Sequence, residues 1–98
     1  MLYSFEDIKK EGVSLDINVL KTLFQDGVLV RAEIIPVPLK KAWLVVVREK
    51  DEKPIILSNG KGLEKHFKGV NAAMTAVRSI GFREVRTLLP NKNIPITR

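Results

Sequence analysis

The sequence contains no cysteine and only one histidine. The absence of cysteine excludes disulfides, thiolate zinc sites and a cysteine nucleophile. A zinc site without thiolates usually relies on several histidines, so one histidine argues against a metal centre of that kind. We therefore expect neither a metal site nor a cofactor.

Long apolar stretches are also missing. The longest uninterrupted apolar run covers residues 42–47, whereas a membrane-spanning helix needs about 20 apolar residues. The N-terminus does not show the basic segment followed by an apolar segment that marks a secretory signal. The sequence therefore predicts a cytoplasmic protein with no membrane contact.

Catalytic patterns are absent as well. Ser58 lies outside any G-x-S-x-G context, and the glycine-rich residues 60–62 lack the full spacing of a P-loop. A tight turn explains these glycines better. His66 lies among lysines, where a histidine more often makes surface contacts than acts as a catalyst. We expect the protein not to be an enzyme.

Acidic residues are scarce in the second half of the chain. Residues 1–49 contain seven Lys or Arg and seven Asp or Glu, whereas residues 50–98 contain ten Lys or Arg and four Asp or Glu. The second half therefore carries the whole formal net charge of +6. Such asymmetry favours a polyanionic partner, although lysine-rich turns that only keep a small protein soluble would give the same balance.

The apolar periodicity predicts one α+β domain over residues 1–90, with residues 91–98 as a candidate mobile tail. We expect an N-terminal helix pair, a three- to four-stranded antiparallel sheet, a C-terminal amphipathic helix and a short final strand. The expected helices cover residues 5–10, 15–25 and 70–80. The expected strands cover residues 28–35, 42–48, 55–58, 63–68 and 85–89, with a hairpin turn at Asn59 and Gly60.

A basic β-hairpin followed by a helix N-terminus is the candidate site for a polyanion. Lysines can contact phosphates, glycines allow close approach of the backbone, and a helix N-terminus adds unpaired amide groups. We predict a small non-enzymatic protein that binds nucleic acid, duplex DNA ahead of RNA. The candidate binding residues are Arg48, Lys53, Lys61, Lys65, His66, Lys68, Arg83 and Arg86.

A second interpretation stays open. The N-terminal helices are amphipathic and balanced in charge, so they can form an interface with another protein or with a second copy of the chain. The protein would then be an interaction or inhibitor module, or a homodimer, that uses these helices or an open sheet edge. Its lysines would serve solubility.

The middle of the chain resembles known DNA-binding modules. Trp43 in a central strand, the glycine-containing hairpin, Phe67 and the helix opening at Val70 are similar to the pattern of integrase arm-binding and AP2-type domains. In those families the sheet face reads the major groove, which implies this role for Arg48, Lys53, Lys61 and Lys65. The order of helix, three strands and helix also resembles double-stranded-RNA-binding domains. Lys65 and Lys68 partly match the lysine cluster that this family has at the start of its last helix.

Overall fold

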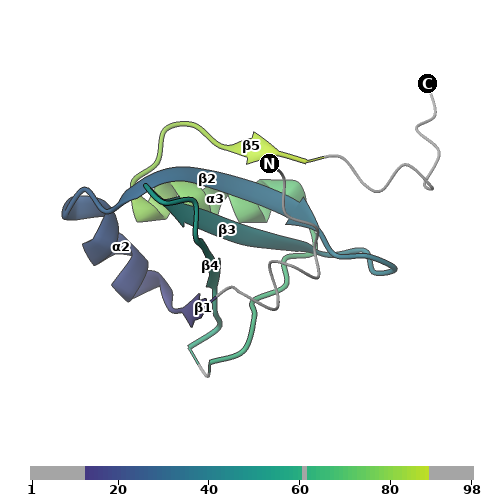
Figure 1. The fold of residues 1–98 in the computed structure, drawn as a ribbon. Coiled ribbons are helices and arrows are strands. Elements are labelled where there is room, and N and C mark those ends of the chain that lie inside the picture. Colours follow the sequence, from purple (N-terminus) through teal and green to yellow (C-terminus); the bar gives the residue numbers. More distant parts are fainter. Residues whose placement is uncertain (1–12, 61, 89–98) are drawn as a thin grey trace.

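The structure, a computed structural model, describes residues 13–60 and 62–88. These residues form an α+β domain, as predicted, with one five-stranded sheet and two helices (Figure 1). The predicted helix of residues 5–10 and the tail of residues 91–98 lie outside the described residues. The elements are β1 (Val13–Leu15), α2 (Ile17–Gln25), β2 (Leu29–Pro36), β3 (Trp43–Glu49), β4 (Pro54–Leu57), α3 (Val70–Ile80) and β5 (Arg86–Thr87).

The sheet is mixed, which corrects the prediction of an antiparallel sheet. Its strands lie in the order β1-β4-β3-β2-β5. Strands β2, β3 and β4 form an antiparallel meander, whereas β1 pairs parallel with β4 and β5 pairs parallel with β2. The two edge strands are only three and two residues long. Short edge strands offer little backbone for pairing with another chain.

The start of the first described helix also differs from the prediction. The helix was expected to begin at Leu15, but Ser14 and Leu15 pair with β4 instead. Asp16 is the N-cap, and its carboxylate accepts a hydrogen bond of 3.0 Å from the backbone amide of Val19. This bond satisfies one of the amide groups that the first helical turn leaves unpaired.

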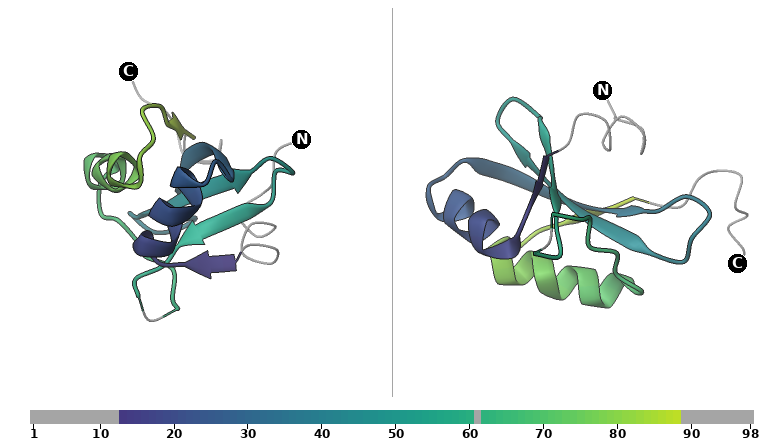
Figure 2. Two further views of the ribbon diagram at one scale, coloured as in Figure 1. Left: turned by 90° about the vertical axis from the view of Figure 1, so that its left-hand side faces the viewer. Right: turned by 90° about the horizontal axis from the view of Figure 1, so that it is seen from below.

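Strand β3 lies at the centre of the sheet, and its apolar character on both faces agrees with the prediction. Leu44, Val45, Val46 and Val47 are all completely buried. Val45 and Val47 face α2 and α3, which lie on the same side of the sheet (Figure 2). Their main partners in this layer are Leu20 of α2, Ala73, Val77 and Ile80 of α3, and Ala32, Ile34, Ile55 and Leu57 of the neighbouring strands.

Helix α3 occupies the predicted residues, and one face of it is buried. Val77 and Ile80 lie in the core, whereas Met74 is 41% exposed. Ala76 also packs against the core. The helix ends at Gly81, whose φ of 133° lies in a region that favours glycine.

The second strand of the predicted hairpin does not form. After β4 the chain makes one isolated bridge between Ser58 and Glu64, and then returns to β3, where Phe67 pairs with Trp43. Two backbone hydrogen bonds of 2.8 Å join Phe67 and Trp43. The chain therefore leaves the sheet at the end of β4 and re-enters it at Phe67, beside the start of β3.

Candidate nucleic-acid interface

The bridge between Trp43 and Phe67 brings two basic segments together. Lys41 lies two residues before Trp43, in the loop between β2 and β3, and Lys68 directly follows Phe67. Because the pairing is antiparallel, the backbone of Lys68 lies opposite Ala42. The loop before β3 and the loop before α3 consequently meet at the same end of the molecule.

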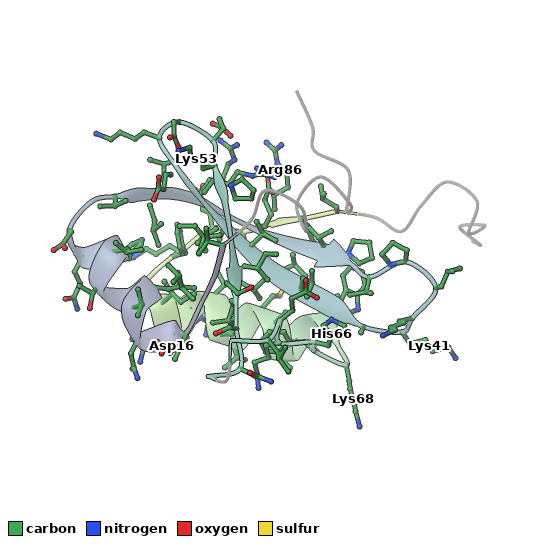
Figure 3. All side chains as sticks on the ribbon, turned by 60° about the horizontal axis from the view of Figure 1, so that its bottom comes forward. Asp16, Lys41, Lys53, His66, Lys68 and Arg86 are labelled. Carbon is green, nitrogen blue, oxygen red and sulfur yellow. The ribbon has the colours of Figure 1, made fainter. Side chains whose placement is uncertain are left out.

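We call this region the basic end, defined by Lys40, Lys41, Lys65, His66 and Lys68. All five side chains are exposed. Lys41, His66 and Lys68 lie on one side of the molecule, away from Lys53 and Arg86 (Figure 3). The two segments that build this end, residues 34–48 and 65–83, contain no Asp or Glu. Four of the five residues are lysines, and none of these lysines takes part in an ion pair within the described residues.

Two contacts shape the basic end locally. The ammonium group of Lys65 lies 5.5 Å from the centre of the Phe67 ring, within the range of a cation–π interaction. His66 Nε2 lies 3.4 Å from Glu64 Oε1. Glu64 is the nearest acid in sequence, and its side chain is only 17% exposed. The solvent-facing charge of this region therefore comes mainly from lysine.

The N-terminus of α3 adds to the positive potential at the same end. Its N-cap is Gly69, which has no side chain to accept a hydrogen bond, and its first turn contains no acid. Helix α2 differs, because the carboxylate of Asp16 caps it. The partial positive charge of a helix N-terminus is therefore offset by an acid at α2 and remains open to an external anion at α3.

A cavity of about 300 Å³ adjoins the basic end through Lys65 and Phe67. Its other walls come from the start of α2, the end of β4, the following loop and Ala76 of α3. Three of its polar groups already have local partners. Asp16 caps α2, the Ser58 hydroxyl accepts a hydrogen bond from the Gly60 amide at 3.5 Å, and Lys65 lies over the Phe67 ring. These contacts give each of the three groups a structural role.

Arg48 was expected on an exposed sheet face, but it is buried and only 4% exposed. Its guanidinium lies 3.0 Å from the carboxylate of Glu33, to which Nε donates a hydrogen bond of 3.1 Å. Its Nη1 donates to the backbone carbonyl of Glu52 at 3.0 Å. Glu33 is also buried, at 2% exposure. We leave Arg48 out of the interface because its charge is neutralised inside the fold.

Arg31 and Glu52 extend this ion-pair group to the surface. The Arg31 guanidinium forms a two-pronged contact with the Glu52 carboxylate, and Arg31 Nε lies 3.6 Å from Glu33. The hydrogen bonds from Arg31 hold the pKa of Glu52 below its ordinary value. This group contains two acids and two arginines, so it presents no net charge to a polyanion.

Of the remaining predicted residues, those that the structure describes do not join the basic end. Lys53 is exposed in the turn between β3 and β4, where it lies 3.9 Å from Asp51. Arg83 is exposed between α3 and β5, and Arg86 is exposed on β5. Lys61 lies outside the described residues. The structure thus groups only Lys65, His66 and Lys68 of the predicted set.

Lys40 and Lys41 belong to the same surface, although the sequence did not lead us to predict them as binding residues. Two adjacent lysines in the loop before β3 can be recognised from the sequence. The pairing of β3 with Phe67, which brings these lysines to the basic end, cannot. Across residues 13–60 and 62–88, no group of three or more histidine or acidic residues is arranged to hold a metal ion. No helix in these ranges has the length and apolar character needed to cross a membrane.

Comparisons of the chain with protein-family models, with curated proteins and with solved structures found no match. The residues and their arrangement are therefore the whole basis for a functional assignment.

Proposed function

We propose that this protein binds duplex nucleic acid, DNA ahead of RNA, through the basic end. One observation carries the proposal. The bridge between Trp43 and Phe67 joins two acid-free segments, so that Lys40 and Lys41 share one exposed surface with Lys65 and Lys68. A surface of this kind attracts phosphates and releases their condensed counterions on binding.

The uncapped N-terminus of α3 supports the same proposal. Its first-turn amide groups point out of the helix beside Lys68, where a phosphate can accept hydrogen bonds from them. The lysines supply the long-range attraction, and the amides supply a fixed geometry. No base-reading contact is needed for this mode of binding, so we expect weak sequence preference and a Kd of about 10⁻⁶–10⁻⁴ M at physiological salt.

A binding titration with charge-matched variants tests the proposal. The first variant replaces Lys41, Lys65 and Lys68 with Ala. The second replaces Lys21, Lys50 and Lys53, so it removes the same charge from other parts of the molecule. Fluorescence anisotropy with a 20-base-pair DNA duplex at about 100 mM salt should show a loss on the order of 100-fold for the first variant. The second should lose less than about tenfold.

The results of this titration distinguish the proposed surface from a bulk charge effect, and DNA from RNA as the ligand. Equal losses in both variants would reduce the binding to a bulk charge effect and contradict the proposed surface. Failure of the wild-type protein to bind at about 50 mM salt would overturn nucleic-acid binding altogether. The order of helix, three strands and helix, α2-β2-β3-β4-α3, makes duplex RNA the competing ligand. Tighter binding to an RNA duplex of the same length would overturn the preference for DNA.

A further inference from the structure

The loop between β2 and β3 places one leucine at its tip, completely exposed. Leu39 has a relative exposure of 101%, the highest among the large apolar residues that the structure describes. It is flanked by Pro38, which is also exposed, and by Lys40. An exposed leucine alone would need no explanation, but the backbone at this position is unusual.

Leu39 adopts a backbone conformation that favours glycine. The amide of Lys40 donates to the carbonyl of Val37 at 3.3 Å, which closes a four-residue turn with Pro38 in the second position. Leu39, in the third position, has a φ of 63°. Proline followed by a positive φ is the pattern of a type II turn, in which the third position is usually glycine or asparagine. A leucine here is therefore both strained and exposed.

Glu52 has the same kind of backbone strain as Leu39 but has contacts that compensate for it. Among the described residues other than glycine, only Leu39 and Glu52 have a positive φ. The strain at Glu52 is compensated within the fold, because its side chain pairs with Arg31 and its carbonyl accepts a hydrogen bond from Arg48. Leu39 makes no such contact. Strain that the fold does not compensate points to a contact with an external partner.

The turn holds Leu39 rigidly. Val37 is 6% exposed and packs in the apolar layer on the sheet face opposite the helices, where Ala42 packs beside it. The amide of Val37 donates to the carbonyl of Ala42 at 2.9 Å, which closes the base of the loop. Two prolines, Pro36 and Pro38, further restrict the backbone. The backbone that carries the leucine thus has little conformational freedom left to lose on binding.

We propose that Leu39 is an apolar wedge that enters the minor groove of duplex DNA and unstacks a base step, while Lys40 and Lys41 contact the flanking phosphates. This inference rests on the proposed function and adds how the surface engages the duplex. Leucine is among the residues that minor-groove proteins insert between base pairs. Pyrimidine–purine steps such as TA unstack most readily, so we expect a preference for duplexes that contain them.

A lipid surface is the other chemistry that an apolar tip with lysines would suit. Stable attachment to a membrane usually requires two anchoring signals, such as a long acyl chain together with a polybasic patch. One leucine buries far less apolar surface than an acyl chain. The lysines Lys65 and Lys68 belong to another loop and extend the charge away from the tip, along a track that a phosphate backbone can follow. These features favour the duplex.

The test uses a 20-base-pair DNA duplex with 2-aminopurine in a central TA step, and a matched duplex with 2-aminopurine in an A-tract. The wild-type protein should raise the fluorescence in the TA duplex and not in the A-tract, because 2-aminopurine brightens when it is unstacked. Leu39→Gly, which suits a φ of 63°, should abolish the rise and weaken binding to the TA duplex about tenfold. Its salt dependence should stay unchanged, because no phosphate contact is lost.

Two further variants make the result specific. Leu39→Met keeps an apolar side chain at the tip of the loop and should keep the fluorescence rise. Val30→Ala removes an exposed apolar side chain at the far end of β2 and should bind like the wild type. If Leu39→Gly binds both duplexes like the wild type and keeps the rise, the wedge is wrong and the proposed function stands. If the wild type binds no duplex, both fail. Sedimentation with phosphatidylserine vesicles that depends on Leu39, without an effect on DNA, would overturn the wedge in favour of a lipid surface.

Discussion

Arg48→Met is expected to destabilise the fold without weakening the proposed binding of nucleic acid. The substitution keeps most of the apolar volume of the side chain and removes its charge. It leaves the carboxylate of Glu33, which is 2% exposed, without its nearest cation at 3.0 Å. Arg31 Nε, at 3.6 Å, is the cation that remains beside Glu33.

The size of the effect follows from the burial of the pair. Removal of one partner from a buried ion pair costs about 3–5 kcal/mol, because the other charge stays desolvated and uncompensated. Arg31 retains part of the compensation, so we expect a cost near the lower limit, about 3 kcal/mol. A domain of this size is stable by roughly 5–15 kcal/mol, and urea m-values of about 1–3 kcal/mol/M then predict a fall of about 1–3 M in the urea midpoint.

Urea unfolding followed by Trp43 fluorescence measures this loss, and a double variant provides the control. Glu33→Leu combined with Arg48→Met removes both charges, and its stability should lie close to that of the wild type or above it. Binding to duplex DNA, measured under conditions in which each variant is folded, should stay unchanged. An unchanged urea midpoint for Arg48→Met together with a loss of DNA affinity would refute the ion-pair argument and return Arg48 to the interface.

Three further outcomes test other parts of the structure. Gly81→Ala should cost about 2–5 kcal/mol in chemical denaturation, because φ is 133° and the added Cβ would lie 2.5 Å from Cδ2 of Phe24; an unchanged midpoint would contradict that packing. Because Arg31 lowers the pKa of Glu52, the stability from this pair is complete above the ordinary value of 4.5 and is lost as the pH falls through the lowered pKa. Glu52→Gln should therefore flatten the acid limb of stability against pH, and an unaltered limb would argue against the pair. Leu39→Gly should change the free energy of unfolding by less than about 1 kcal/mol, because relief of the backbone strain offsets the entropy of glycine; a larger loss would show that the leucine supports the fold.

The helix and the strand whose apolar residues follow a regular pattern were predicted correctly from the sequence. The helix of residues 70–80 has apolar residues at helical spacing and a glycine directly after it, and the structure has α3 over the same residues. The apolar run before Arg48 predicted a central strand, and β3 lies in the middle of the sheet. Burial of one or both faces of a helix or strand determines which positions along it are apolar, so the pattern can be read from residues close together in the sequence.

Partners that are distant in sequence were not predictable in the same way. Asn59 and Gly60 favour a tight hairpin, and this preference suggested that residues 63–68 return along β4. In the structure only the start of this segment returns along β4, through the bridge of Glu64 with Ser58 and a hydrogen bond of 3.0 Å from the Lys65 amide to the Leu57 carbonyl. Phe67 pairs with Trp43, because β3 extends beyond the end of β4 and offers unpaired backbone groups there. The parallel pairing of Val13 with Ile55 was missed for the same reason, since a three-residue strand has no periodicity of its own.

In the candidate site, too, features that depend on neighbouring residues were predicted, and features that depend on residues distant in sequence were not. The lysines and the histidine before α3 were recognisable from the lack of acids around them. The position of Lys41 beside Lys68 depends on the bridge between β3 and Phe67, so the sequence could not reveal it. Arg48 could not be excluded from the sequence, because alternation along β3 places it on one face but does not show that the Glu33 carboxylate lies within hydrogen-bonding distance of its guanidinium.

The salt dependence of duplex binding tests the central claim most directly. If Lys40, Lys41, Lys65 and Lys68 neutralise about four phosphates, log Kobs should fall against log salt with a slope of about −3.6. The Lys41, Lys65 and Lys68 triple alanine variant should reduce this slope to about −0.9, whereas the Lys21, Lys50 and Lys53 triple alanine variant should keep it near the wild-type value. Equal slopes for the two variants would contradict the claim that the basic end is the surface that binds nucleic acid.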